Sequence, residues 1–198
     1  MVYHIPALLN ESIEGLNIKP GGTYADVTFG GGGPTREILK HIGSGKLVAF
    51  DQDEDATANI PDDKRIIFLN QNFRFLKNNL IFNNIDSIDG LIADLGVSFH
   101  QFDEASRGFT FREDAPLDMR MNKNSKTNAA DILRDKDEEA LATIFYRYGE
   151  LRNSRQIARR IVSARSERPL VSAEDLMNLT GSMAPPRQEH KFFARLFQ

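Results

Sequence analysis

The sequence predicts an α/β protein with a parallel sheet, followed by an all-helical segment. Two observations lead to this fold class. In the first half of the chain, short apolar runs alternate with segments of helical periodicity, which is typical of βα units joined by right-handed crossovers. In the second half, the apolar residues recur only at helical spacing. The four expected strands span 23–29, 46–51, 65–70 and 88–96.

Helical segments separate these strands. The first helix is expected over 5–16, where apolar residues recur at helical spacing ahead of Gly21 and Gly22. A proline opens the next helical segment, and its fixed φ suits the first turn of a helix. The helices expected after the first three strands span 34–42, 54–60 and 73–82.

The second half of the chain has a different organisation. Residues 97–127 are rich in charge and phenylalanine and are expected to form a loop, and helices are expected over 128–134, 137–149, 153–165 and 172–180. We therefore expect an α/β domain over 1–104, an inserted helical subdomain over 105–185, and the start of a return helix over 186–198. Four parallel strands make a thin sheet, so we expect the sheet to be incomplete and the chain to be a fragment.

Composition excludes several classes of protein and site. The chain is 40% hydrophobic and 27% charged, which is ordinary for a globular protein, and it has no cysteine. Disulfides, thiolate–zinc sites and a cysteine nucleophile are therefore excluded within it. The four histidines have no metal-ligand spacing, so no metal site is expected. Without a membrane-length apolar run or a signal-peptide pattern, we expect a cytoplasmic protein that does not contact membranes.

The charge is unevenly distributed along the chain. The formal net charge is −3, which does not indicate general nucleic-acid binding. Residues 147–168, however, carry seven arginines against Glu150 and Glu167. This pattern predicts a local basic patch on an acidic body.

Four consecutive glycines, Gly30–Gly33, lie between the first expected strand and the first crossover helix. A glycine turn in this position brings an anionic ligand onto the amides of a helix N-terminus. The dinucleotide pattern GxGxxG is only partly met, because Gly30 and Gly32 fit but Thr35 occupies the third position. The alternative is a flexible linker.

Asp51, at the end of the second expected strand, points to the class of ligand. A carboxylate there can accept hydrogen bonds from both ribose hydroxyls of an adenosine, which both NAD and S-adenosylmethionine (SAM) carry. Capping of the following helix is an alternative role. A calcium loop through Asp51, Asp53 and Asp55 is rejected, because Ala56 stands where such a loop needs glycine.

Asp94 interrupts the otherwise apolar fourth expected strand. Ligands of open parallel sheets bind beyond the carboxyl ends of the strands, where Gly30–Gly33 and Asp51 are also expected. Asp94 is therefore either a residue of the same site or a buried helix cap.

Several segments together resemble one enzyme family. They are HIPALLNE (4–11), DVTFGGGG (26–33), DLGVS (94–98), RGFTFREDAPLDMRM (107–121), YGE (148–150) and RQIARRIV (155–162). The chain is similar over its whole length to the MraW family, SAM-dependent methyltransferases that act on N4 of a cytosine in bacterial 16S ribosomal RNA. The resemblance implies a Rossmann-like class I SAM-methyltransferase sheet with a helical insertion, and the small ribosomal subunit as partner.

The resemblance also implies which residues contact SAM. They are Gly32, Gly33, Pro34, Asp51, Phe73, Asp94 and Gln101, and Gly30 joins them from the glycine turn. Position 34 is usually histidine in this family, so the proline removes a side-chain hydrogen bond to the cofactor but suits the helix start. The residues before Gln101 read SFH where relatives often have SSP.

The same comparison suggests roles in chemistry and RNA binding. Asp94, or the carbonyl groups of 95–98, would hold the target amine. Phe99, Phe102, Phe109 and Phe111 are candidate stacking platforms for an extruded base, and the alternative for each is to pack the loop against the sheet. Arg152, Arg155 and Arg159 would share one helix face and contact RNA phosphates, unless they form a solvated face with internal ion pairs.

Two other functions stay open at this level. An NAD-dependent oxidoreductase would use the same glycine turn, and a non-catalytic RNA-binding or ribosome assembly factor would use the arginine-rich segment. The sequence also leaves open whether an exposed sheet edge drives homodimer formation.

Overall fold

The computed structural model describes residues 8–198. The first part of the helix expected over 5–16, and of the segment HIPALLNE, lies outside the described residues. The chain forms two compact units, which are described separately. Unit 1 comprises Met1–Ser98 with Met121–Lys123, and unit 2 comprises Phe99–Arg120 with Asn124–Gln198. None of the described helices is long and apolar enough to cross a membrane.

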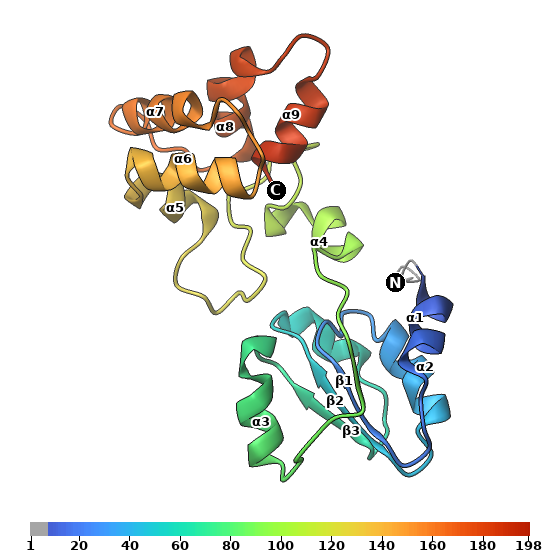
Figure 1. The fold of residues 1–198 in the computed structure, drawn as a ribbon. Helices are drawn as coiled ribbons and strands as arrows, with labels where there is room; N and C mark the ends of the chain where they lie inside the picture. The colour runs from blue at the N-terminus through green and yellow to red at the C-terminus, as the bar shows by residue number, and fades with distance from the viewer. Residues whose placement is uncertain (1–7) are drawn as a thin grey trace. The chain divides into compact units, whose positions relative to one another are not determined.

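The described residues of unit 1 contain a four-stranded parallel sheet (Figure 1), which confirms the predicted fold class. The strands are β1 (Thr23–Asp26), β2 (Lys46–Phe50), β3 (Ile66–Leu69) and β4 (Gly90–Ile92), and their order is β3-β2-β1-β4. Strand β4 is much shorter than the predicted 88–96. Its ladder ends where Ile92 pairs with Asp26, the last residue of β1, so the residues beyond it lack a strand to pair with.

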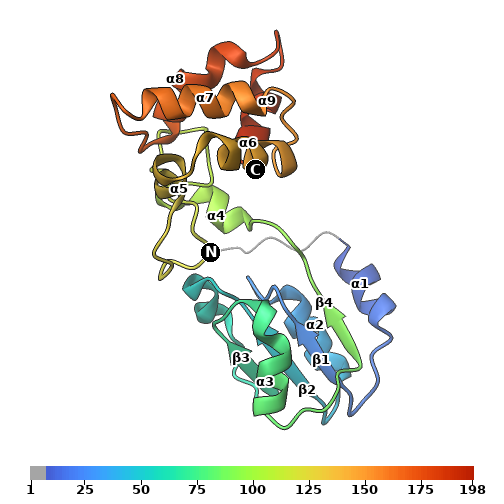
Figure 2. The same cartoon turned by 60° about the vertical axis from the view of Figure 1, so that its left-hand side comes forward.

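Helices cover both faces of this sheet (Figure 2). Successive strand residues point to opposite faces, so Tyr24 and Ala25 belong to different halves of the core. On one side Tyr24 and Leu47 pack with helices α1 (Leu9–Leu16) and α2 (Gly33–His41). On the other side Ala25, Val48 and Phe50 pack with α3 (Leu76–Phe82). The segments predicted as helices over 54–60 and 73–82 contain the 3-10 turns η1 (Glu54–Asn59) and η2 (Phe73–Phe75), the second leading into α3.

Unit 2 is helical in its described residues and has a core of its own. Leu141, Phe145, Ile157, Ile161 and Leu176 are buried in that core. Its elements are α4 (Phe99–Asp103), η3 (Ala105–Arg107), α5 (Ala129–Asp135), α6 (Glu138–Arg147), α7 (Ser154–Ala164), α8 (Ala173–Thr180), η4 (Gly181–Met183) and α9 (Glu189–Leu196). The loop expected over 97–127 therefore contains α4 and η3.

The caps and ends of unit 2 follow from local sequence. Ser172 and Asp175 form a capping box at the start of α8, and Asn128 with Asp131 forms a second one at α5. Residues 186–198 belong to unit 2, because Phe192 and Leu196 of α9 pack in its core.

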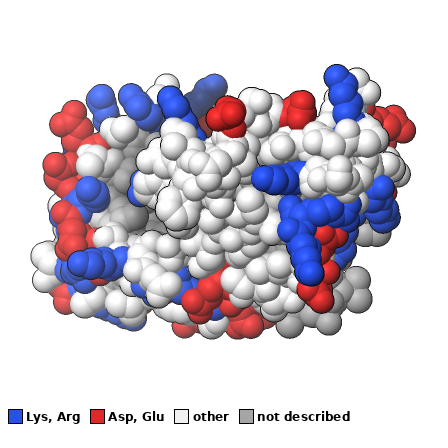
Figure 3. Space-filling view, turned by 90° about the horizontal axis from the view of Figure 1, so that it is seen from below, with Lys and Arg blue, Asp and Glu red and all other residues white. Residues whose placement is uncertain are grey.

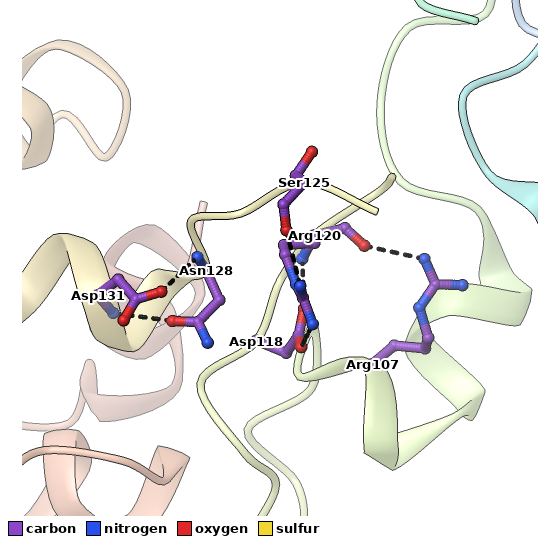
Figure 4. A network of polar contacts seen from close by, with 6 residues as sticks. All are labelled: Arg107, Asp118, Arg120, Ser125, Asn128 and Asp131. Atoms are coloured by element: carbon purple, nitrogen blue, oxygen red, sulfur yellow. Dashed lines mark hydrogen bonds and ion pairs between the residues drawn. The ribbon is translucent and has the colours of Figure 1, made fainter. Parts of the chain in front are cut away.

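Two arginines fix the conformation of the segment RGFTFREDAPLDMRM (Figure 4). Arg120 donates through Nε and Nη2 to the two carboxylate oxygens of Asp118, at 2.9 and 2.7 Å. This pairing lowers the pKa of Asp118. Arg107 is buried and donates to the carbonyl oxygen of Arg120 at 3.0 Å. Asp114 accepts from the backbone N–H of Glu174, and these bonds hold the loop in shape.

Candidate functional site

The strands of unit 1 end at one edge of the sheet, and the predicted site residues of that unit follow them there. Gly30–Gly33 follow β1, and Asp51 directly follows β2. Phe73 is the first residue of η2, which follows β3. Asp94 lies just beyond β4. Because parallel strands end at the same edge, the fold brings these residues to the same edge of the sheet.

The glycine turn is a braced structure. Gly30 and Gly32 have φ angles of 49° and 72°, in the left-handed region that favours glycine. A Cβ atom on Gly32 would lie 2.9 Å from Cζ of the buried Phe29 ring. The side chain of Asn59 donates to the Gly30 carbonyl at 3.0 Å, and Arg36 donates to the carbonyl groups of Gly31 and Asn59. These bonds exclude the flexible-linker alternative.

Asp51 fastens the turn to the end of β2. Its Oδ2 accepts the N–H of Gly30 at 2.7 Å and its Oδ1 accepts the N–H of Asp53 at 2.9 Å. Burial is the main reason that the pKa of Asp51 is raised, and the two hydrogen bonds oppose it. The helix-cap alternative for Asp51 is wrong, because Asp53 is the residue that caps η1, by accepting the N–H of Asp55.

Asp26, the last residue of β1, was missed as a site residue. It is fully buried, and its carboxylate accepts the Thr35 hydroxyl at 2.8 Å and the N–H of Thr28 at 3.2 Å. These bonds join the end of β1 to helix α2 across the glycine turn. Burial raises the pKa of Asp26 to about 6. Asp26 could have been found from the sequence as an aspartate at the end of an apolar strand, the same feature that pointed to Asp94.

The raised pKa predicts a pH-dependent contribution to stability. The folded protein holds the Asp26 proton more tightly than the unfolded chain, whose carboxyl group titrates near its ordinary 3.8. Asp26 therefore favours folding most below about pH 4, and this contribution is lost as the pH rises through about 6. In urea titrations, we expect the stability of wild type relative to Asp26→Asn to fall by on the order of 2–3 kcal/mol over that range. Parallel pH curves for the two proteins would contradict this assignment.

Asp94 differs from the buried residue that the sequence allowed. It is exposed, and its backbone N–H donates to the Thr28 hydroxyl at 2.7 Å. The buried helix-cap alternative is therefore wrong. The bond through Thr28 fixes the backbone beyond β4 beside the backbone that leads into the glycine turn, while the carboxylate faces solvent.

The other predicted residues lie in unit 2 or on its surface. Gln101 lies in α4 and is buried. Phe109 is buried, and Phe111 packs against Phe193 and Phe197, so neither ring is a free platform. Phe99 and Phe102 are more than 40% exposed.

The three predicted RNA-binding arginines do not share one helix. Arg155 and Arg159 lie on α7, but Arg152 lies in the turn before it, because the helix begins only at Ser154. Arg159 pairs loosely with Glu138 at 3.3 Å. Figure 3 shows Lys and Arg side chains interspersed with Asp and Glu side chains.

Among the described residues, no group of three or more His, Cys, Asp or Glu side chains could hold a metal ion. The polar groups at the sheet edge are carboxylates, hydroxyls and backbone amides engaged with one another. The arrangement can bind a ligand that offers hydroxyl donors to Asp51 and lies against bare glycine backbone.

Comparison with known proteins gives one consistent result. The chain matches the family described as "MraW methylase family" over residues 1–198. It is 49% identical over 198 residues to "Ribosomal RNA small subunit methyltransferase H" of Phocaeicola vulgatus, and 49% and 48% identical over 199 residues to the proteins of that name from Bacteroides thetaiotaomicron and Flavobacterium johnsoniae. These matches cover 100% of this chain but only 65%, 66% and 66% of the three relatives. The chain belongs to the MraW methylase family.

Proposed function

We propose that the chain binds SAM at the carboxyl edge of unit 1, as part of an enzyme that methylates N4 of a cytosine in 16S ribosomal RNA of the small subunit. The observation that carries the proposal is the braced glycine turn joined to Asp51, in a chain that matches the MraW methylase family over 1–198. The relatives' names supply the class of substrate, ribosomal RNA of the small subunit. The cytosine and its N4 atom come from the family resemblance.

The residues present fit SAM. The missing side chains of Gly30–Gly33 leave backbone for the methionine end of the cofactor to lie against. Asp51 uses one lone pair of each carboxylate oxygen on a backbone N–H, and each oxygen keeps a second one for a ribose hydroxyl. Phe73 is 42% exposed and offers a ring to the adenosine part. When bound, SAM would supply a methyl group on a positively charged sulfur, with the neutral thioether as the leaving group when a nucleophile bonds to the methyl carbon.

The chain's own contribution to transfer is to position the amine. The N4 amine of cytosine is conjugated with the ring and is a weak nucleophile. The exposed Asp94 carboxylate can accept one N4–H, direct the nitrogen lone pair and stabilise the positive charge that develops on nitrogen. Transfer to carbon 5 normally needs a cysteine nucleophile, and the chain has none.

Pro34 gives a specific prediction for cofactor binding. Pro34 lies in the first turn of α2, where its fixed φ suits the start of a helix, and it is buried. If histidine at this position donates a hydrogen bond to the cofactor, Pro34→His should tighten SAM binding by about tenfold, the effect of one hydrogen bond of about 1–1.5 kcal/mol. Calorimetric titration with SAM measures it. An unchanged affinity would show that position 34 makes only a backbone or van der Waals contact.

The proposed reaction is tested by transfer of a labelled methyl group from SAM to small subunits that lack the modification. The 198-residue chain is compared with the longer Phocaeicola vulgatus relative under the same conditions, and the RNA is digested to identify the labelled nucleoside. We expect the labelled nucleoside to be N4-methylcytidine. Label on another nucleoside, or no label with either protein, would contradict the proposal.

A further inference from the structure

The seven arginines of residues 147–168 fall into two groups. The first group donates to side chains or carbonyl groups of unit 2, and its members are Arg159, Arg160, Arg165 and Arg168. The second group, Arg147, Arg152 and Arg155, is exposed, and the described part of the chain provides its side chains with no hydrogen bond or ion pair. The second group lies around the connection between α6 and α7.

The same connection carries two tyrosines at the surface. Tyr146 and Tyr148 are 64% and 68% exposed, although each ring could contribute substantial apolar area to a core. The residues on either side, Phe145 and Gly149, are buried. Gly149 packs so closely on α9 that a Cβ atom there would lie 2.4 Å from the carbonyl oxygen of Arg195. The backbone is therefore anchored, while both tyrosine rings point to solvent.

The charge of this corner is positive. Its acidic residue within 146–155 is Glu150, and the Arg195 guanidinium lies 3.3 Å from the Glu150 carboxylate. The cations of Arg147, Arg152 and Arg155 are thus not neutralised locally, in a chain whose net charge is −3. Exposed aromatic rings among uncompensated arginines are the combination that binds single-stranded nucleic acid, by stacking on bases and pairing with phosphates.

We propose that the corner formed by Tyr146, Arg147, Tyr148, Arg152 and Arg155 binds an unpaired segment of RNA. The tyrosine rings stack on bases and the three arginines contact phosphates. This inference rests on the proposed function, and it moves the RNA surface from the helix face of Arg155 and Arg159 to the α6–α7 connection. A duplex suits the corner less well, since its bases are not available for stacking.

The test measures binding of a fluorescently labelled single-stranded RNA to the 198-residue chain by anisotropy over a range of salt concentrations. Replacement of both Tyr146 and Tyr148 by alanine should weaken binding by about thirtyfold or more, because two stacked bases are lost, and should leave the salt dependence unchanged. Replacement of both by phenylalanine keeps the rings and should restore the affinity. Arg152→Gln with Arg155→Gln should lower the slope of log affinity against log salt by about 1.4, which is 0.7 for each phosphate contact.

Two controls and a second readout keep the outcomes separate. Phe82→Ala removes another highly exposed ring, from unit 1, and Arg160→Gln removes an arginine that donates to Ser182; both variants should bind RNA like wild type. Wild-type affinity in the double tyrosine variant, an equal loss with Arg160→Gln, or equal binding of duplex RNA would overturn the proposal. RNA binding is measured without SAM. A failed methyl-transfer assay would therefore contradict the proposed reaction but not the proposed RNA-binding corner.

Discussion

Gly32→Ala is expected to lower the free energy of unfolding of unit 1 by about 2–5 kcal/mol, and to abolish SAM binding. The left-handed conformation at φ 72° destabilises an alanine by about 1–2 kcal/mol. Its methyl group would also lie 2.9 Å from Cζ of Phe29. That ring is 1% exposed and packs edge-on against Phe68 at 5.1 Å, so it has no room to retreat, and overpacking adds about 1–3 kcal/mol.

Gly30→Ala is the matched control for this prediction. Gly30 also has a positive φ, of 49°, but the nearest atom to an added Cβ is the Thr28 carbonyl oxygen at 3.9 Å. Only the conformational cost of about 1–2 kcal/mol applies. Urea titration and calorimetric titration with SAM are run on both variants. Equal losses of stability would show that contact with Phe29 does not decide the conformation of the turn.

Asp94→Ala is expected to slow methyl transfer by about 10²–10³-fold, the effect of removing one group that stabilises charge in a transition state. The side chain is exposed and forms no bond that holds the turn, because only the backbone N–H of Asp94 contacts Thr28. Because the family resemblance also places Asp94 among the SAM contacts, the slowing is measured at saturating SAM, where only the positioning of the amine is lost. Single-turnover transfer to small subunits, with SAM binding measured in parallel, separates the two effects.

Asp86→Ala provides the comparison for Asp94. Asp86 is also an exposed carboxylate, but it precedes β4 and lies at the opposite end of that strand. It should transfer methyl groups like wild type. If Asp94→Ala and Asp86→Ala behave alike, Asp94 does not position the amine, and the carbonyl groups of residues 95–98 take over that role.

The strand and helix pattern of unit 1 could be predicted because its signals are local. Alternating apolar runs identified all four strands, and Pro34 marked the start of α2. The end of β4 could not be predicted in this way. Residues 93–96 extend the strand-like run apart from Asp94, but β1 ends at Asp26, and pairing with a strand far away in the sequence sets the length of β4.

The other inaccurate predictions concern segments that are too short to show a periodic pattern or residues whose role depends on contacts made only in the folded chain. The five residues of α4 are too few to show helical periodicity, so the segment 97–127 was expected to be a loop. Arg152 matched the spacing of a helix face, although the chain turns at Leu151 before α7 begins. Asp26 was missed because its role depends on burial beside Thr35, a contact made only when β1 and α2 are assembled.

The most direct test of the cofactor site is equilibrium binding of SAM and of NAD to the 198-residue chain. Both ligands offer ribose hydroxyls to Asp51, but the third glycine of the dinucleotide pattern is replaced by the buried Thr35, whose hydroxyl is bound to Asp26. We expect SAM to bind, Asp51→Ala to weaken it by about tenfold or more, and NAD not to compete. Tighter binding of NAD than of SAM, or SAM binding that is indifferent to Asp51→Ala, would contradict the assignment of this edge of the sheet as a SAM site.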